Sequence, residues 1–102
     1  MLSLLKNLFK NNSVDLSQLI KDGAVIVDVR SKAEFATGHV KGSINIPLEQ
    51  VGASAEKLNL HKYVITCCRS GNRSGMALRT LQSKGLKNVI NGGSWQNVNQ
   101  YK

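Results

Sequence analysis

The sequence predicts an α/β domain in which helices flank a mainly parallel central sheet. Two short apolar runs, residues 24–29 and 63–67, have the composition of buried strands. A helical pattern follows each run, and strands that alternate with helices are typical of a layered fold with a parallel sheet. A chain of 102 residues has room for one compact domain with one small core, so any active site must be built from the loops of that domain.

Residues 1–11 form the first predicted element, a short amphipathic helix with several leucines and Phe9 on one face. Lys6 interrupts the apolar stretch too early for a secretory signal. Two interpretations stay open, namely that this helix packs on the domain or that it makes a weak contact with a membrane surface. Neither inserts the chain stably into a membrane. We expect the domain itself to occupy residues 12–102.

The next elements surround the first strand. Asp15 is the predicted N-cap of a helix that Gly23 ends. The strand at residues 24–29 follows. Ser31 and Glu34 then have the spacing of a capping box, in which each side chain bonds the backbone N–H of the other. A short helix is therefore expected immediately after this strand.

The second half of the chain repeats the alternation. Residues 44–46 are expected to form a brief strand, and residues 48–60 have the pattern of an irregular helix and a turn. The apolar run at residues 63–67 predicts another strand, and a helix is expected from Ser74 onward. The polar tail at residues 96–102 predicts a short, frayed end of the chain.

The segment between the second apolar run and its helix carries the predicted chemistry. It contains Cys68, a glycine turn at Gly71, and two arginines, Arg69 and Arg73. A loop that enters a helix N-terminus directs backbone N–H groups and the positive end of the helix dipole toward one point. Such a cup stabilises an anion or a thiolate. We therefore predict that Cys68 has a lowered pKa and acts as a nucleophile, with nearby serine hydroxyls as further donors.

The two cysteines, Cys67 and Cys68, are neighbours in the chain. An ordinary disulfide cannot close between adjacent residues without strain, so the pair indicates a reducing compartment, and we expect a cytoplasmic protein. The alternation of side chains along a strand should point Cys67 away from Cys68. Cys67 is then either a buried strand residue or, if the loop rearranges, a resolving thiol.

Positive charge is concentrated in the second half of the chain. The net charge is +8, and residues 57–102 contain eight bases and no acid. Small anions, acidic proteins and nucleic acid all suit such a field. With only five aromatic residues and no interleaving of aromatic and basic side chains, nucleic acid is not expected as a partner. No metal and no cofactor are predicted, because neither metal-ligand spacing nor a nucleotide-binding loop is found.

Four separated segments resemble the rhodanese-like domains, specifically the small single-domain sulfurtransferases. The segments are residues 27–30 with Glu34 and Phe35, residues 38–47, residues 68–74 and residues 91–95. The resemblance implies a three-layer rhodanese-like fold whose loop cysteine takes the outer sulfur of a donor such as thiosulfate and holds it as a persulfide. The implied partners are a small anionic sulfur donor and an acceptor, which is a thiol, a protein thiol or cyanide.

The resemblance also assigns roles to single residues. Cys68 matches the sulfur-accepting cysteine, and the family chemistry needs no cofactor. The loop that binds the substrate consists of Arg69, Ser70, Gly71, Asn72, Arg73 and Ser74. We expect Arg69 to attract the donor anion and Arg73 to tie down the loop, with Asp28 as its partner. Asp28 and Arg30 are expected to support neighbouring loops through hydrogen bonds rather than to touch the substrate.

Two alternative functions stay open. Counted from Cys67, the loop has the length typical of cysteine-dependent phosphatases, although Thr66 stands where the phosphatase pattern has His. A phosphatase also needs a general acid for the leaving oxygen. The second alternative is a non-enzymatic sulfur carrier or anion-binding module, which docks on an acidic partner through the basic half of the chain.

Overall fold

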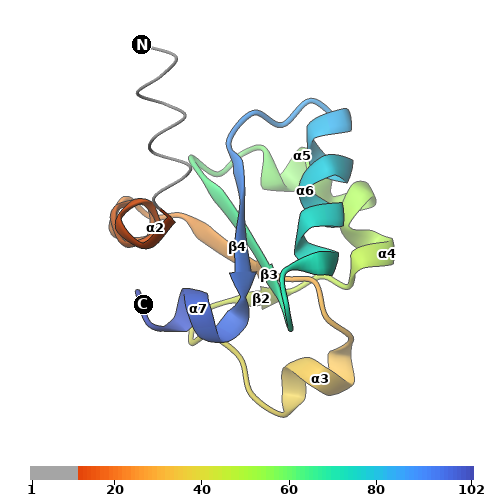
Figure 1. Ribbon diagram of the computed structural model, residues 1–102. Helices are drawn as coiled ribbons and strands as arrows, with labels where there is room; N and C mark the ends of the chain where they lie inside the picture. The colour runs from red at the N-terminus through yellow and green to blue at the C-terminus, as the bar shows by residue number, and fades with distance from the viewer. Residues whose placement is uncertain (1–11) are drawn as a thin grey trace.

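The computed structural model describes residues 12–102, which form a four-stranded sheet with helices on both faces (Figure 1). The elements in chain order are α2 (Asn12–Lys21), β1 (Val25–Asp28), α3 (Lys32–Ala36), β2 (Ile44–Asn45), α4 (Leu48–Val51), the 3-10 turn η1 (Gly52–Ser54), α5 (Ala55–Leu58), β3 (Val64–Cys68), α6 (Asn72–Ser83), β4 (Val89–Ser94) and α7 (Trp95–Asn99). The strand order is β2-β1-β3-β4, and all neighbouring strands are parallel. The predicted α/β class with a parallel central sheet is confirmed.

Two apolar clusters fill the spaces between the three layers. One cluster, which includes Val27, Leu58 and Leu81, lies between the sheet and the helices α4, α5 and α6. The other, which includes Leu16 and Val98, lies between the sheet and the helices α2 and α7. Figure 1 shows these two groups of helices on opposite sides of the sheet. Because both faces are covered, all five residues of β3 are buried.

The carboxyl ends of the strands meet at one edge of the sheet, and the turn from β3 into α6 lies there (Figure 1). The helix α3 lies beyond the same edge. Its N-cap is Ser31, and the capping box with Glu34 predicted from the sequence is confirmed. In parallel α/β sheets this edge is where ligands bind, so the fold brings the predicted cysteine loop to a suitable place.

Two helix starts differ from the sequence prediction. Asp15 is not an N-cap, because α2 already includes Asn12 and Asp15 has helical backbone. The predicted helix at residues 1–11 lies outside the described residues. The helix expected from Ser74 begins earlier, at Asn72, after Gly71 in a left-handed conformation. The apolar pattern of the sequence marks only the buried face of α6. The first turn of this helix carries polar residues of the loop, so its start gives no apolar signal.

The C-terminal segment also differs from the prediction. Residues 96–102 were expected to fray, but α7 begins at Trp95, the side chain of Ser94 caps it, and Val98 is fully buried. Trp95 and Val98 are three positions apart, which is a helical spacing of apolar side chains. The polar residues around them made this short pattern difficult to recognise in the sequence. The strand β4 was not predicted, because the glycines at positions 92 and 93 disfavour a strand.

Candidate active site

Cys68 ends β3, and its side chain lies in the turn that leads into α6. The Sγ atom accepts hydrogen bonds from the backbone N–H of Gly71 at 3.0 Å and of Ser74 at 3.4 Å. The thiol also donates to Ser74 Oγ at 3.4 Å. Gly71 adopts a φ of +100°, a left-handed conformation that favours glycine. The turn and the start of the helix therefore form a cup of donors around one sulfur atom.

This cup favours the charged form of the thiol. Burial raises the pKa of Cys68, but hydrogen bonds from the Ser74 hydroxyl and from the backbone N–H groups of Ser74, Gly71 and Ser70 lower it by more. The resulting pKa is below the ordinary value of a cysteine. A thiolate at the end of a strand and the start of a helix is the usual form of a nucleophilic cysteine.

The rim of the cup is exposed and basic. Arg69, Ser70 and Asn72 are all exposed to solvent. The N–H groups of Asn72 and Arg73 lie in the first turn of α6, where no intrahelical acceptor exists, and within residues 12–102 neither donates to a backbone carbonyl. The ion pairs found in this part of the chain do not include Arg69. Its charge is therefore available to an anion that approaches the sulfur.

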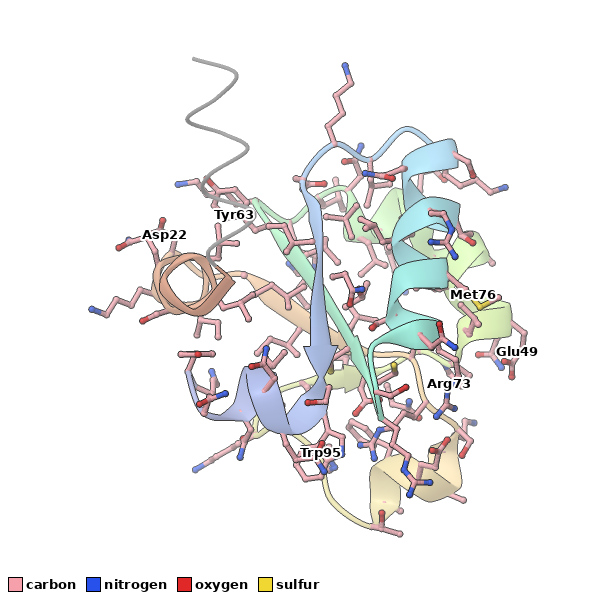
Figure 2. The ribbon with its side chains drawn as sticks, in the orientation of Figure 1. Asp22, Glu49, Tyr63, Arg73, Met76 and Trp95 are labelled. Carbon is pink, nitrogen blue, oxygen red and sulfur yellow. The ribbon has the colours of Figure 1, made fainter. Side chains whose placement is uncertain are left out.

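Arg73 joins the start of α6 to α3. Its Nη1 and Nη2 atoms donate to Glu34 Oε1 at 2.7 Å and Oε2 at 2.9 Å, and Figure 2 shows Arg73 beside the start of α6, on the side toward α3. The expectation that Arg73 binds Asp28 is wrong, because Arg30 occupies that carboxylate. The hydrogen bonds from Arg73 and from the Ser31 N–H hold the pKa of Glu34 well below its usual range. The sequence identified Glu34 as a capping residue and as part of a family segment, but its link to the cysteine loop through Arg73 was not predicted.

Asp28 and Arg30 form a buried ion pair. Arg30 Nε donates to Asp28 Oδ1 at 2.9 Å, and Nη2 donates to Oδ2 at 2.6 Å. The same Nη2 donates to the carbonyl of Gly38 at 2.7 Å, and the guanidinium lies 5.1 Å from the ring centroid of Trp95. The hydrogen bonds that Arg30 donates to the Asp28 carboxylate raise the pKa of Arg30. The pair thus ties β1 to the loop after α3, and neither residue hydrogen-bonds Cys68, an arrangement that fits loop support.

Cys67 lies on the other face of the sheet from Cys68. It packs in the cluster under α2 and α7, whereas Cys68 belongs to the cluster under α4, α5 and α6. Burial, with a contribution from the charge of Asp28, raises the pKa of Cys67 to about 12. A thiol in this environment is not a nucleophile at neutral pH. The phosphatase alternative, which requires Cys67 in that role, therefore does not fit the geometry, and the resolving-thiol interpretation does not fit it either.

Residues 12–102 contain neither a cluster of metal ligands nor a membrane-spanning helix. In this part of the chain no group of three or more His, Cys, Asp or Glu side chains is arranged to hold a metal ion. No helix there is both long enough and apolar enough to cross a membrane.

Known protein families provide an independent comparison with this geometry. The model of the rhodanese-like domain matches residues 12–100. The chain belongs to the rhodanese-like domain family. The match extends through α7, beyond the segments that the sequence motifs covered, and it includes the whole cup around Cys68.

Several relatives of this rhodanese-like domain carry names that refer to sulfur transfer. It is 42% identical over 66 residues to YrkF of Bacillus subtilis (strain 168), named as a candidate sulfur carrier protein, and the aligned part is 65% of this chain and 36% of YrkF. It is 31% identical over 82 residues to the thiosulfate sulfurtransferase GlpE of Pseudomonas fluorescens (strain SBW25), covering 79% of this chain and 75% of GlpE.

A solved structure shares both the fold and part of the sequence. A rhodanese from E. coli, solved with anions, superimposes with a TM-score of 0.68 at 31% identity, covering 74% of this chain and 91% of that chain. The domain spans only part of some curated relatives, 36% of YrkF and 54% of the Bacillus subtilis protein YqhL.

Proposed function

We propose that this rhodanese-like domain is a sulfurtransferase that moves a sulfane sulfur from thiosulfate to a thiol through a persulfide on Cys68. The observation that carries the proposal is the cup of donors around the Cys68 sulfur, with Gly71 N–H at 3.0 Å and Ser74 N–H at 3.4 Å. These groups stabilise negative charge on that sulfur, and a persulfide sulfur is also anionic at neutral pH.

The first half-reaction loads the cysteine. The Cys68 thiolate attacks the outer sulfur of thiosulfate, a new S–S bond forms, and the S–S bond of thiosulfate breaks. Sulfite leaves with the electron pair, and Cys68 holds the transferred sulfur as a persulfide anion. The available N–H groups of Asn72 and Arg73 suit the new sulfur, since they point from the first turn of α6 and have no backbone acceptor within residues 12–102.

Arg69 suits the recognition of the donor. It is exposed at the rim of the cup and belongs to neither ion pair found in residues 12–102, whereas Arg73 and Arg30 are each paired with a carboxylate. The eight bases at residues 57–102 add a positive field that attracts a small dianion. The related E. coli rhodanese solved with anions supports the same class of ligand.

The second half-reaction unloads the cysteine. The thiolate of an acceptor attacks the outer sulfur, the Cys68 S–S bond breaks, and the Cys68 thiolate leaves as the acceptor becomes a persulfide. Cyanide is an alternative acceptor and becomes thiocyanate. We further propose a protein thiol as the acceptor in the cell and a reducing, cytoplasmic setting, because both cysteines within residues 12–102 are free.

Mass spectrometry tests the loading step. The reduced full chain is incubated with thiosulfate and analysed as intact protein and as peptides. We expect one added sulfur atom on Cys68, retained in Cys67→Ala, absent in Cys68→Ser and removed by cyanide. Absence of the added sulfur from a folded, reduced wild-type protein would refute the proposal.

A carrier role is the second candidate, favoured by the similarity to YrkF. Turnover separates the two functions. With excess thiosulfate and excess thiol, an enzyme releases many equivalents of sulfite per chain. A carrier loads one sulfur per chain and releases further sulfite only when its protein partner is added.

A further inference from the structure

Asn91 lies on β4, directly opposite Thr66 of β3, and its side chain bonds two residues of the cup and Gly93 of its own strand. Its Nδ2 donates to the carbonyl of Gly71 at 3.2 Å. Its Oδ1 accepts the hydroxyl proton of Ser74 at 2.7 Å and the backbone N–H of Gly93 at 2.9 Å. Two of these partners, Gly71 and Ser74, are the residues whose N–H groups bond the Cys68 sulfur.

A bulge in β4 gives Asn91 this position. Thr66 pairs with Asn91 but Cys68 pairs with Ser94, so β4 contains one residue more than β3 between these two pairs. Gly93 makes the bulge possible with a φ of +84°. At the bulge, the Gly93 N–H donates to the side chain of Asn91 in the same strand.

Glycines leave just enough room for this amide group. A Cβ atom on Gly75 would lie 3.3 Å from Asn91 Nδ2, and a Cβ on Gly71 would lie 3.4 Å from the Cα of Gly93. The turn before α6 therefore packs directly on the bulge of β4. Asn91 links the two segments by hydrogen bonds, and the Ser74 hydroxyl adds a longer contact of 3.5 Å to the carbonyl of Gly93.

We propose that Asn91 is a positioning residue for Cys68. It holds Gly71 in the conformation in which the Gly71 N–H donates to the sulfur, and it accepts the hydroxyl proton of Ser74 while the thiol is neutral. In the neutral form the Cys68 thiol donates to Ser74 Oγ, and the Ser74 hydroxyl donates to Asn91 Oδ1. When Cys68 loses its proton to solvent, the Ser74 hydroxyl is free to turn toward the thiolate. Asn91 Oδ1 then keeps the Gly93 N–H as its donor, so no buried acceptor is left without a partner.

The proposal gives Asn91 two opposite effects on the Cys68 thiol. Anchoring of Gly71 favours the thiolate, because it keeps the shortest N–H contact on the sulfur. Competition for the Ser74 proton disfavours the thiolate, because Asn91 Oδ1 is the nearer acceptor. Removal of the hydroxyl in Ser74→Ala eliminates the second effect and leaves only the first.

The experiment measures the rate of alkylation of Cys68 by iodoacetamide as a function of pH in the full chain, with peptide mapping of the product. The midpoint of the rate profile reports the pKa of the thiol. In a Ser74→Ala background, we expect Asn91→Ala to raise the midpoint by about 0.5 to 1 pH unit, which is a roughly three- to tenfold loss of rate at pH values well below both midpoints. In the wild-type background the rise is smaller, because release of the Ser74 hydroxyl offsets it.

Two further variants separate positioning from general destabilisation. Asn91→Leu keeps the branched shape of the side chain, with two methyl groups in place of the amide atoms, and removes its hydrogen bonds, so it should move the midpoint as Asn91→Ala does. Asn88→Ala is the matched control, because Asn88 also bonds two backbone carbonyls, those of His61 and Lys62, but precedes β4 at the opposite end of the sheet. It should leave the midpoint unchanged.

The charges around Cys68 are the same in all these variants. Arg73 on α6 stays paired with Glu34 on α3, and β4 has no charged residue. Asp28 in the neighbouring strand β1 pairs with Arg30, and Cys67 in β3 stays protonated. An unchanged midpoint on adding Asn91→Ala or Asn91→Leu to Ser74→Ala would overturn the proposal. Equal shifts with and without Ser74 would overturn the part that concerns its proton.

This inference deepens the proposed function, but its test does not depend on sulfur transfer. Alkylation reports the thiol itself. A domain that alkylates as expected and takes no sulfur from thiosulfate refutes the proposed function and leaves the role of Asn91 intact. A domain that is loaded by thiosulfate and shows no effect of Asn91 on alkylation refutes the role of Asn91 and leaves the proposed function intact.

Discussion

Gly92 has no space for a side chain, and its replacement gives a sharp test of the packing beside the active site. A Cβ atom at this position would lie 2.6 Å from Val98 Cγ2, 2.7 Å from Ile65 Cγ2 and 2.9 Å from the carbonyl oxygen of Thr66. Ile65 and Thr66 are held in β3 of the sheet, so Val98 and the helix α7 must move. Overpacking of this kind costs about 1–3 kcal/mol, partly offset by about 0.4–1 kcal/mol from the stiffer unfolded chain.

We therefore expect Gly92→Ala to lower the free energy of unfolding by about 1–2 kcal/mol and Tm by about 4–16 °C for a domain of this size. Thermal unfolding followed by circular dichroism measures the change. Gly52→Ala is the control, because Gly52 has helical φ and ψ of −61° and −38°, and its added Cβ would meet only side-chain atoms, Thr80 Cγ2 at 3.3 Å and Lys84 Cε at 3.7 Å. Alanine is favoured in a helix, so Tm should be equal or higher. A Tm of Gly92→Ala within about 1 °C of wild type would show that the packing argument is wrong.

Three other predictions concern the site. At neutral pH, iodoacetamide should label the folded wild type once, on Cys68, whereas labelling of Cys67 should require unfolding, since burial keeps it protonated with a pKa of about 12. Arg69→Ala should raise KM for thiosulfate severalfold with unchanged Tm. Arg73→Ala should lower Tm, because it removes the ion pair with Glu34. If Arg73→Ala lost only affinity for the donor, this division of roles would be contradicted. Glu34→Gln keeps a capping side chain but loses the ion pair, so its Tm should be lower than wild type at pH 7. Because the folded pKa of Glu34 is depressed, the difference should shrink as the pH falls below the unfolded value of about 4.5, and a constant difference would argue against the ion pair.

The parts of the fold that the sequence predicted are those with a local signal. The apolar run that ends at Asp28 and the spacing of Ser31 and Glu34 depend only on neighbouring residues, and the strand and capping box are present as expected. The cysteine loop also has a local signal, because a thiol, a glycine turn and a helix start follow one another. The structure places Cys68 and Gly71 in contact accordingly.

The parts that the sequence did not predict depend on distant partners. The strand β4 contains two adjacent glycines, which disfavour a strand, and only the presence of Val98 and Ile65 around Gly92 explains why glycine is required there. The sequence suggested Asp28 as the partner of Arg73. The choice of Glu34 follows from the separate pairing of Asp28 with Arg30, which no spacing in the sequence reveals.

The placement of Cys67 and Cys68 on opposite faces of one strand has a consequence for the lifetime of the loaded protein. In many thiol enzymes a second cysteine attacks the modified one and releases its cargo within the same molecule. Here the sheet itself stands between the two sulfur atoms, so no internal thiol reaches a sulfur held on Cys68. Under the proposed chemistry, the loaded state persists until an external thiol arrives, and the rate of delivery is set by the concentration and access of that acceptor.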